Sequence, residues 1–400
     1  MSATTSTTTS TPLVDVLILG AGPAGLACAT ALSRQLHTCL VLSSAPSSSS
    51  SPSPSPSPSS SPSAAAEKEQ EKGEKGGQYQ APHFRNARAR HMHNVLGWEH
   101  ADPAAFRARA RADLEARYGD TAAVRDGVDV VRVERIDDGG KETQGSRTRF
   151  RAVDATGAVY EGRKLVLACG IRDVMPDIPG YAELWGRGIF HCLFCHGYES
   201  RGRASVGVLA AHGLLAKNPP TTIAAMCRMA GRLAARSSVT VYTDGADADA
   251  AGLRAAGLRS RRRFRVDERR IVGLARDPEM EGEEGEAGVL VMLADGSVAR
   301  EGFLAHVPNF ELGGPASLIT NLHLQLAAQG HIEARPPFWA TSAPGVYAAG
   351  DCATPLRSVA MAAAMGAAAA AGLAHELQAE DDDVEDEEDE DEDVEDEVSK

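Results

Sequence analysis

Residues 14–25 read VDVLILGAGPAG, a short apolar strand pattern that runs directly into a glycine-rich turn. Three glycines stand in the G-x-G-x-x-G spacing, and the helical pattern LACATALSRQL follows at once. Such glycines permit a tight turn, close approach of a pyrophosphate to the backbone, and tight packing of the helix on the strand. The helix N-terminus adds free N–H groups and a positive dipole end. The stretch predicts a dinucleotide site, and its binding residues are Gly20, Gly22, Pro23, Ala24 and Gly25.

The second strand pattern, TCLVLSS, lacks one element of that motif. An acidic residue at the end of this strand usually binds the adenosine ribose. Here Ser43 and Ser44 stand in its place. A serine hydroxyl can still hydrogen-bond a ribose hydroxyl, without the strength that a charged acceptor adds. We therefore predict Ser43 as the ribose contact.

Strand and helix patterns alternate along the rest of the chain. A helical pattern, PAAFRARARADLEARYG, precedes the strand patterns DVVRVERI, TRFRAVDATG and RKLVLACG. A new strand–helix unit opens at ASVGVLAA, and SVTVYTDG follows it. This alternation predicts an α/β protein with doubly wound, mostly parallel sheets. We expect two nucleotide-binding (Rossmann-like) domains, the second inserted into the first.

Composition sets the expected boundaries. The Ser/Pro tract and the charged stretch after it cannot bury enough apolar surface to offset the entropy of ordering. The predicted segments are a disordered N-terminus (1–12), a discontinuous first nucleotide-binding domain (13–185 and 303–378) with a disordered insertion (46–77), an inserted domain (186–302) and a disordered acidic tail (379–400).

The net charge of −14 comes from the tail, because residues 380–397 hold sixteen Asp or Glu and two Val. Without them and Lys400, 40 basic residues face 39 acidic ones. A nearly neutral body does not predict a nucleic-acid surface. The chain shows no run of 18 apolar residues and no secretory signal pattern, so we expect no membrane span and a cytoplasmic location.

Residues 190–198 read FHCLFCHGY, and the C-x-x-C-H core has several chemical interpretations. It can attach a c-type haem, supply half of a zinc site or form a redox-active disulfide. A haem site needs an exported protein, and a structural zinc site needs a second close pair, which the other cysteines do not form. A redox disulfide is the favoured interpretation, and two buried structural thiols are the remaining alternative. We expect no metal site. The other cysteines are Cys28, Cys39, Cys169, Cys227 and Cys352.

Four motifs in this order carry a resemblance to a known family: LGAGPAG, LVLACGIRDVMPDIPGY, HCLFCHGYE and APGVYAAGDC. Together they resemble the class II (low-molecular-weight) thioredoxin reductases. More closely they resemble the fungal branch of FAD-dependent dithiol oxidases, of the gliotoxin oxidase type, to which FRNARARHMHNVLGWEHADPAAF is also similar. The resemblance extends from Val14 to about Leu377, without the Ser/Pro insertion and the acidic tail.

This resemblance implies FAD in the first domain and the disulfide in the inserted domain. Asp351, in GVYAAGD, would hydrogen-bond the ribityl–pyrophosphate region of FAD. LRSVAMAAAMG would form a helix whose N-terminus faces the flavin, where a positive dipole end stabilises the reduced anionic form. The family usually has Arg-Gln where this chain has Arg-Ser. The residues implied to bind FAD are Asn94, Gly170, Gly350, Asp351, Arg357, Ser358 and Val359.

By the same resemblance, Cys192 would meet the substrate and Cys195 would face the flavin. We expect the pair at the start of a helix, whose N-terminus would lower the thiolate pKa. Most thioredoxin reductases have Asp after the second cysteine, whereas this chain has His196. Imidazole titrates near neutral pH, so His196 is our candidate general acid and base. His91 and His93 could assist it, or form a surface pair.

The inserted domain departs from a reductase that uses NADPH. SVGVLAAHGLLAKNPP has lost the second G-x-G-x-x-G spacing, and Asp244 stands where arginines would hold a 2′-phosphate. This puts NADP(H) binding in doubt and favours an oxidase that takes electrons from a small-molecule dithiol and passes them through FAD to dioxygen. The alternatives are an NADPH-dependent disulfide reductase of the thioredoxin reductase type and a catalytically silent flavin-binding protein. The resemblance also implies a homodimer.

Overall fold

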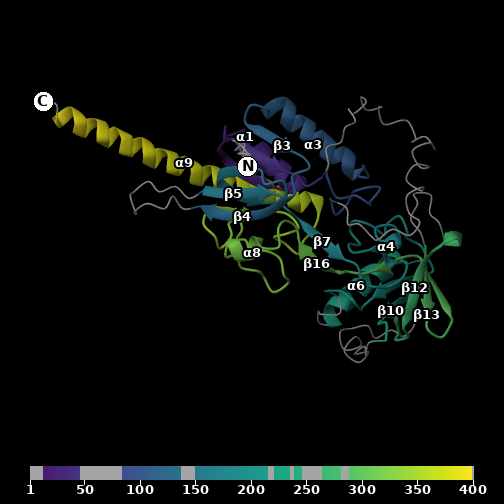
Figure 1. Cartoon of the computed structure of the whole chain (residues 1–400). Coiled ribbons are helices and arrows are strands. Elements are labelled where there is room, and N and C mark those ends of the chain that lie inside the picture. Colours follow the sequence, from purple (N-terminus) through teal and green to yellow (C-terminus); the bar gives the residue numbers. More distant parts are fainter. Residues whose placement is uncertain are drawn as a thin grey trace, which may run out of the picture.

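The computed structural model describes residues 12–45, 83–136, 149–214, 220–234, 238–245, 264–280 and 288–398, with side chains to Asp383. Within these ranges the strands form two units, which lie at opposite ends of a short two-stranded connection (Figure 1). The predicted insertion 46–77 lies outside the described residues, as does all of the predicted N-terminal segment except Pro12.

The first unit is built on a seven-stranded sheet of order β3-β2-β1-β6-β5-β4, in which β17 also pairs with β6. β1, β2, β3, β6 and β17 are parallel, whereas β4, β5 and β6 form an antiparallel meander. Its strands are β1 (Val14–Leu19), β2 (Cys39–Leu42), β3 (Ala122–Arg125), β4 (Val130–Ile136), β5 (Arg149–Asp154), β6 (Val159–Leu167) and β17 (Val346–Ala348). Its helices are α1 (Pro23–Ser33), α3 (Pro103–Tyr118), α8 (Leu318–Asn321) and α9 (Val359–Val398).

Apolar, unbroken strand sequences explain the middle of this sheet. Every residue of β2 is buried, and so are the last four residues of β1. Strands covered on both faces have such runs, whereas half-exposed strands alternate. Helices α1 and α9 pack together, and a Cβ at Gly366 would lie 2.1 Å from the carbonyl oxygen of Ala24. Only glycine permits that approach, which holds the first helix of the chain against the last.

The second unit contains a five-stranded parallel sheet of order β11-β10-β9-β15-β8 and an antiparallel sheet of order β12-β13-β14. Helix α6 packs on β9 and β10 through its buried face. The elements are α4 (Tyr181–Leu184), β8 (Ile189–Phe190), β9 (Ser205–Leu209), α6 (Pro220–Leu233), β10 (Ser238–Tyr242), β11 (Phe264–Asp267), β12 (Ile271–Asp277), a 3₁₀ turn (Pro278–Met280), β13 (Gly288–Leu293), β14 (Val298–Glu301) and β15 (Leu304–Ala305). The predicted α/β class with two Rossmann-like units is confirmed.

The chain passes between the units through β7 (Ile171–Val174) and β16 (Asn309–Leu312), which pair antiparallel (Figure 1). This pair differs from the predicted boundaries at 185/186 and 302/303. Helix α4 already packs in the core of the second unit, and β15 belongs to its parallel sheet. The chain therefore passes from one unit to the other near β7 and again near β16. These boundaries are set by strand pairing between distant segments, which local composition does not reveal.

Helix α9 also departs from the expectation of a disordered tail from residue 379 onward. It runs without a break to Val398 and leaves the first unit at one end (Figure 1). Arg163 contacts Asp381 at 2.7 Å, and the ammonium of Lys164 pairs with Glu376 at 2.7 Å and with Glu380. These basic residues on β6 neutralise the first acidic turn of the tail, which like-charge repulsion alone would open.

By length and composition alone, Val359–Asp383 is apolar enough to cross a membrane. The same stretch packs on α1, and Met365, Ala369 and Leu373 are buried in the core of the first unit. Those contacts are typical of a core helix in a globular domain.

Candidate active site

The first glycine loop has the geometry of a phosphate cradle. Gly20, between β1 and α1, has φ +113°, and a Cβ there would lie 2.3 Å from the oxygen of Ala168. At Gly25 a Cβ would meet the oxygen of Gly20 at 1.9 Å, which explains why both positions need glycine. A Cβ at Gly22 would meet no described protein atom within 4 Å, so that face of the loop is open. Pro23 begins α1, whose N–H groups face the same space.

This loop opens into a cavity of about 320 Å³ that reaches from the first unit to the C-x-x-C segment. The sequence-predicted residues that line it are Gly20, Gly22, Pro23, Ala24, Ser43, Gly170, Cys195, His196, Gly350, Asp351, Arg357, Ser358 and Val359. Gly25, Asn94 and Cys192 lie outside the lining. Ser43 follows β2 and is buried, as a ribose contact at this strand end requires. Residues from both ends of the chain and from the inserted unit thus meet at one cavity.

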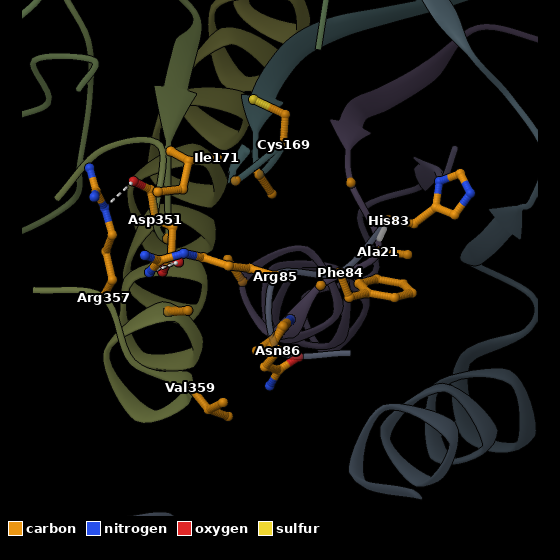
Figure 2. Close-up of a pocket in the computed structure, with 18 of the residues that line it drawn as sticks. Ala21, His83, Phe84, Arg85, Asn86, Cys169, Ile171, Asp351, Arg357 and Val359 are labelled. Atoms are coloured by element: carbon orange, nitrogen blue, oxygen red, sulfur yellow. Dashed lines mark hydrogen bonds and ion pairs between the residues drawn. The ribbon is translucent and has the colours of Figure 1, made fainter. Parts of the chain in front are cut away.

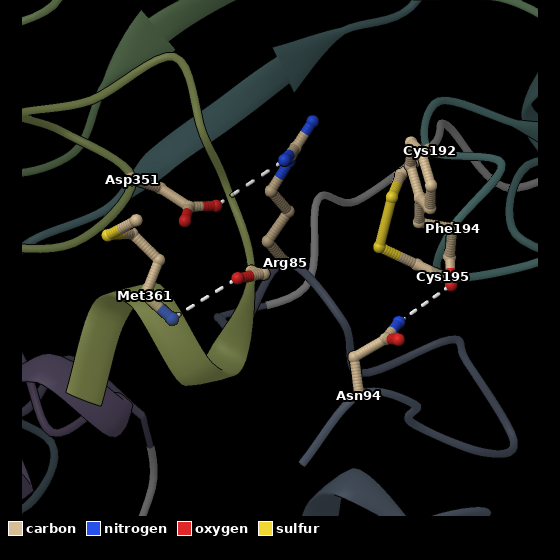
Figure 3. The surroundings of a disulfide bond; sticks show 8 residues. Arg85, Asn94, Cys192, Phe194, Cys195, Asp351 and Met361 are labelled. Carbon is tan, nitrogen blue, oxygen red and sulfur yellow. Dashed lines mark hydrogen bonds and ion pairs between the residues drawn. A yellow bond between two sulfur atoms is a disulfide. The ribbon is translucent and has the colours of Figure 1, made fainter. Parts of the chain in front are cut away.

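An arginine that the sequence analysis did not single out lies at the centre of this cavity. Arg85 donates from Nε and Nη2 to the two carboxylate oxygens of Asp173, both at 2.9 Å. Its Nη1 contacts Asp351 at 3.4 Å (Figures 2 and 3). This fork–fork pairing is the geometry that a guanidinium and a carboxylate favour. No local sequence pattern marks Arg85, because its partners Asp173 and Asp351 follow it by 88 and 266 residues.

The second FAD motif places Asp351 and Arg357 side by side. Nε of Arg357 donates to the carbonyl oxygen of Asp351 at 3.3 Å (Figure 2). Its guanidinium lies 4.0 Å from the ring centroid of Phe310. Burial raises the pKa of Asp351, and the nearby Arg85 and Arg357 charges oppose that rise. Burial and then the Arg85 charge lower the pKa of Arg357 to about 10, which leaves it protonated at neutral pH.

Helix α9 begins where the resemblance placed the flavin-facing helix. Val359 is its first residue, and Ser358 accepts a hydrogen bond from the backbone N–H of Met361 at 3.2 Å. A serine in this position satisfies one of the free N–H groups at a helix start. The remaining groups and the positive end of α9 point toward the cavity, since Arg357, Ser358 and Val359 all line it.

The C-x-x-C pair forms a disulfide between Cys192 and Cys195 (Figure 3). The expected helix start is wrong: the described residues 191–204, between β8 and β9, form turns and no helix. Two hydrogen bonds close the turn, from the N–H groups of Cys195 and His196 to the oxygen of Cys192, at 3.2 and 3.0 Å. Among the described residues, the pair therefore does not stand at the N-terminus of a helix of its own. Cys195 faces the cavity, and Cys192 lies outside its lining.

His196 lines the cavity beside Cys195, with its ring stacked on Phe190 at 5.3 Å between centroids. Among the described residues no partner meets its buried Nε2. The pKa of His196 is lowered to about 4, chiefly by burial; Glu199 opposes this shift, and the nearby His93 and His91 contribute to it. The imidazole is thus neutral at pH 7, but it is a weaker base than the near-neutral titration expected from the sequence would make it.

Asn94 contacts the redox turn rather than the cavity. Its Nδ2 donates to the carbonyl oxygen of Phe194 at 2.8 Å, so it ties residue 94 of the first unit to the loop between the two cysteines (Figure 3). Asn94 has φ +62°, a left-handed conformation that asparagine tolerates better than most residues. This placement makes Asn94 a support of the disulfide turn.

At the carboxyl ends of β9 and β10, where a parallel sheet of this type binds ligands, the second unit carries a hydrogen-bonded histidine and carboxylate. His212 pairs with Asp244, whose other carboxylate oxygen accepts the N–H of Ile271 at 2.5 Å. A Cβ at Gly213 would lie 2.2 Å from the oxygen of Val307, and Leu214 donates its N–H to that oxygen at 2.8 Å. The chain after β9 thus packs on 307–308, and its strand ends present a carboxylate.

Comparison with known proteins agrees with this geometry. The pyridine nucleotide-disulphide oxidoreductase family matches residues 14–208. Thioredoxin reductase aclD of Aspergillus oryzae is 35% identical over 368 residues, which cover 92% of this chain and 97% of that protein. Thioredoxin reductase sirT of Leptosphaeria maculans is 34% identical over 371 residues, which cover 90% and 93%. The chain belongs to the thioredoxin reductase family.

Two solved structures share the fold of this chain. The chain has a TM-score of 0.65 to an oxidoreductase from Agrobacterium tumefaciens, with 27% identity over 92% of this chain and 99% of that one. The crystal structure of HlmI gives a TM-score of 0.67 and 27% identity, over 92% and 94%.

This thioredoxin reductase relative is an FAD-dependent oxidoreductase, and the site fits that cofactor. The Gly20–Gly25 loop leaves room for a pyrophosphate at Gly22, while Gly20 and Gly25 admit no side chain. The start of α9 offers N–H groups to the flavin, and Asp351 is held in place by two arginines. The disulfide lies at the other end of the same cavity through Cys195.

Proposed function

We propose that this thioredoxin reductase relative oxidises a small-molecule dithiol to a disulfide and transfers the electrons through FAD to dioxygen. The observation that carries the proposal is the pairing of His212 with Asp244 at the carboxyl ends of β9 and β10. A nicotinamide dinucleotide phosphate carries its negative charge to this place in a sheet of this type. Asp244 is a carboxylate that already pairs with His212 and accepts a backbone N–H. Its negative charge would repel a 2′-phosphate at this position.

The spacing of the second loop supports the same conclusion. Gly207 is buried inside β9, where a Cβ would lie 2.2 Å from a side-chain carbon of Leu304. Gly213 packs on the backbone of Val307. Both glycines thus serve the packing of the protein, and neither is open to a phosphate as Gly22 is.

The residues of the redox turn fit a dithiol as electron donor. A substrate thiolate attacks Sγ of Cys192, the Cys192–Cys195 bond breaks, and Cys195 leaves as a thiolate. The second substrate thiolate then attacks the substrate sulfur of the mixed disulfide, which releases the oxidised substrate and the Cys192 thiolate. When bound, FAD would supply the two-electron acceptor for the reduced pair and the route for these electrons to dioxygen, which would be reduced to hydrogen peroxide.

Proton transfer in this sequence falls to His196. Its neutral imidazole, with Nε2 buried and unpartnered among the described residues, accepts a thiol proton as each thiolate forms. Cys192 takes the outer role because it lies outside the cavity lining, and Cys195 takes the inner role because it lies within it. The homodimer and the cytoplasmic location stay predictions.

Anaerobic reduction of the purified yellow protein tests the proposal. We expect a small vicinal or 1,4-dithiol to bleach the flavin, NADPH to leave it oxidised, and readmitted air to restore the colour with one peroxide per dithiol oxidised. Cys192→Ser should prevent bleaching by the dithiol at unchanged flavin content. Rapid bleaching by NADPH together with no response to dithiols would instead identify an NADPH-dependent disulfide reductase.

A further inference from the structure

A loop beside the redox turn brings two histidines together. Residues 92–101 form a closed loop, in which the N–H of Met92 donates to Ala101 at 2.8 Å and the N–H of His100 donates to Met92 at 2.9 Å. His93 and His100 stand next to these closing bonds on opposite strands of the loop. His100 has φ +62°, an uncommon backbone conformation for a residue other than glycine. The loop thus sets both imidazoles at one place.

A carboxylate from the second unit completes the group. Glu199 lies four residues after Cys195, and one ligand atom from each of His93, His100 and Glu199 falls within 4.8 Å of the other two. Nε2 of His93 is 3.4 Å from a carboxylate oxygen of Glu199. Ligands bonded at about 2.1 Å to a tetrahedral zinc ion lie about 3.4 Å apart. This pair therefore already has the spacing of two metal ligands.

Nδ1 of His93, the ring nitrogen that would not bind the cation, is paired with a carboxylate, as is usual for a metal-binding histidine. This nitrogen lies 2.7 Å from a carboxylate oxygen of Glu99, whose other oxygen accepts the backbone N–H of Asn94 at 2.8 Å. A carboxylate on one ring nitrogen holds the proton there and leaves the lone pair of the other nitrogen for a metal. The ring of His100 is in turn stacked on His91, at 3.8 Å between centroids. These contacts fix the orientation of both rings.

We propose that His93, His100 and Glu199 bind a first-row divalent cation, Zn²⁺ foremost, with water in the fourth position. Two imidazoles and one carboxylate form a donor set that zinc accepts. This site adjoins the redox turn, since His93 also lines the cavity that Cys195 and His196 face. It replaces the expectation of no metal. Since His93 and His100 come from the first unit and Glu199 from the second, the cation joins the two units beside the disulfide.

Zinc binding to the full-length protein tests this inference. The protein is kept oxidised, so that Cys192 and Cys195 cannot bind zinc, and Zn²⁺ is titrated against a chromogenic chelator. We expect one tight site in the wild type, and its loss in both His100→Gln and Glu199→Gln. Glu99→Gln should weaken it by about 10- to 100-fold, since this is the range for loss of a carboxylate behind a ligand histidine.

Control variants separate the site from other zinc ligands. The acidic segment 380–397 binds cations weakly in every variant, so only the difference between proteins counts. His323→Gln, an exposed histidine outside the loop, should keep the tight site. Co²⁺ bound to the wild type should give the visible absorption of a tetrahedral site, and far-ultraviolet circular dichroism checks that each variant is folded. The proposal is wrong if folded His100→Gln and Glu199→Gln bind zinc with the wild-type stoichiometry and affinity, or if the wild type has no tight site.

Discussion

Replacement of Arg85 by methionine tests the charge arrangement at the centre of the cavity. The variant leaves the buried carboxylate of Asp173 without the two hydrogen bonds that Arg85 donates at 2.9 Å, and it removes the contact to Asp351 at 3.4 Å. Removal of one partner of a buried ion pair costs about 3–5 kcal/mol, because the other charge stays buried. That is a large part of the roughly 5–15 kcal/mol by which folded domains are stable.

The cost of this substitution should depend on pH. Burial already raises the pKa of Asp351, and Arg85 opposes that rise, so the pKa in the variant moves higher still. A carboxyl group whose folded-state pKa lies above its unfolded value stabilises the protein below the unfolded pKa and loses that contribution as pH rises. We therefore expect the variant to lie closest to the wild type near pH 5 and to fall further behind toward pH 8.

Urea unfolding of the holoprotein at several pH values measures both effects, with release of flavin fluorescence reporting the first unit. Arg109→Met is the matched control, since Arg109 pairs with Asp113 on the exposed face of α3 and should change stability little. Addition of Asp173→Asn to the Arg85→Met variant should recover part of the loss. An Arg85→Met variant as stable as Arg109→Met, or a loss that is the same at pH 5 and pH 8, would refute this account of the cavity.

Further substitutions test the glycine loop, the proposed base and the support of the disulfide. Gly25→Ala should yield protein without visible flavin absorbance, because its Cβ would lie 1.9 Å from the oxygen of Gly20; Gly22→Ala, with open space around its Cβ, should leave apoprotein stability unchanged. His196→Gln should lower kcat for dithiol oxidation by about 10²- to 10⁴-fold, whereas the contribution of His196 to the wild-type rate should persist down to about pH 5, since its pKa is about 4. Asn94→Ala should lower the free energy of unfolding by about 1–2 kcal/mol, and Asn94→Gly by less, because glycine tolerates φ +62°; equal losses would show that the backbone conformation contributes nothing.

Local patterns carried most of the information about the fold. The Gly20–Gly25 loop, the apolar strands beside it and the Arg357–Val359 helix start depend on neighbours in sequence, and the structure has each of them where the sequence predicts it. The C-x-x-C spacing predicts a helix start, whereas the structure has a turn between β8 and β9, because the same spacing suits both.

The remaining features depend on contacts between distant segments. Arg85 pairs with carboxylates from β7 and from the turn after β17, and no local pattern marks such a pair. The Glu99–His93–Glu199 arrangement likewise needs the two units to meet. The composition of the acidic segment predicts disorder. The ion pairs that its first turn makes with Arg163 and Lys164 on β6 could not be predicted from it, because these residues are distant in sequence.

The packing of α1 on α9 constrains the order in which the protein can mature during synthesis. The 325 residues between Ser33 and Val359 take about 16–65 s to translate at roughly 5–20 residues per second. Through that interval the phosphate loop has emerged from the ribosome, but β17 has not joined β6 and Gly366 has not reached Ala24. The second unit, whose strands are contiguous in sequence, can fold first. Flavin capture therefore has to be post-translational, and a nascent chain stalled before α9 should carry a folded inserted unit and no cofactor.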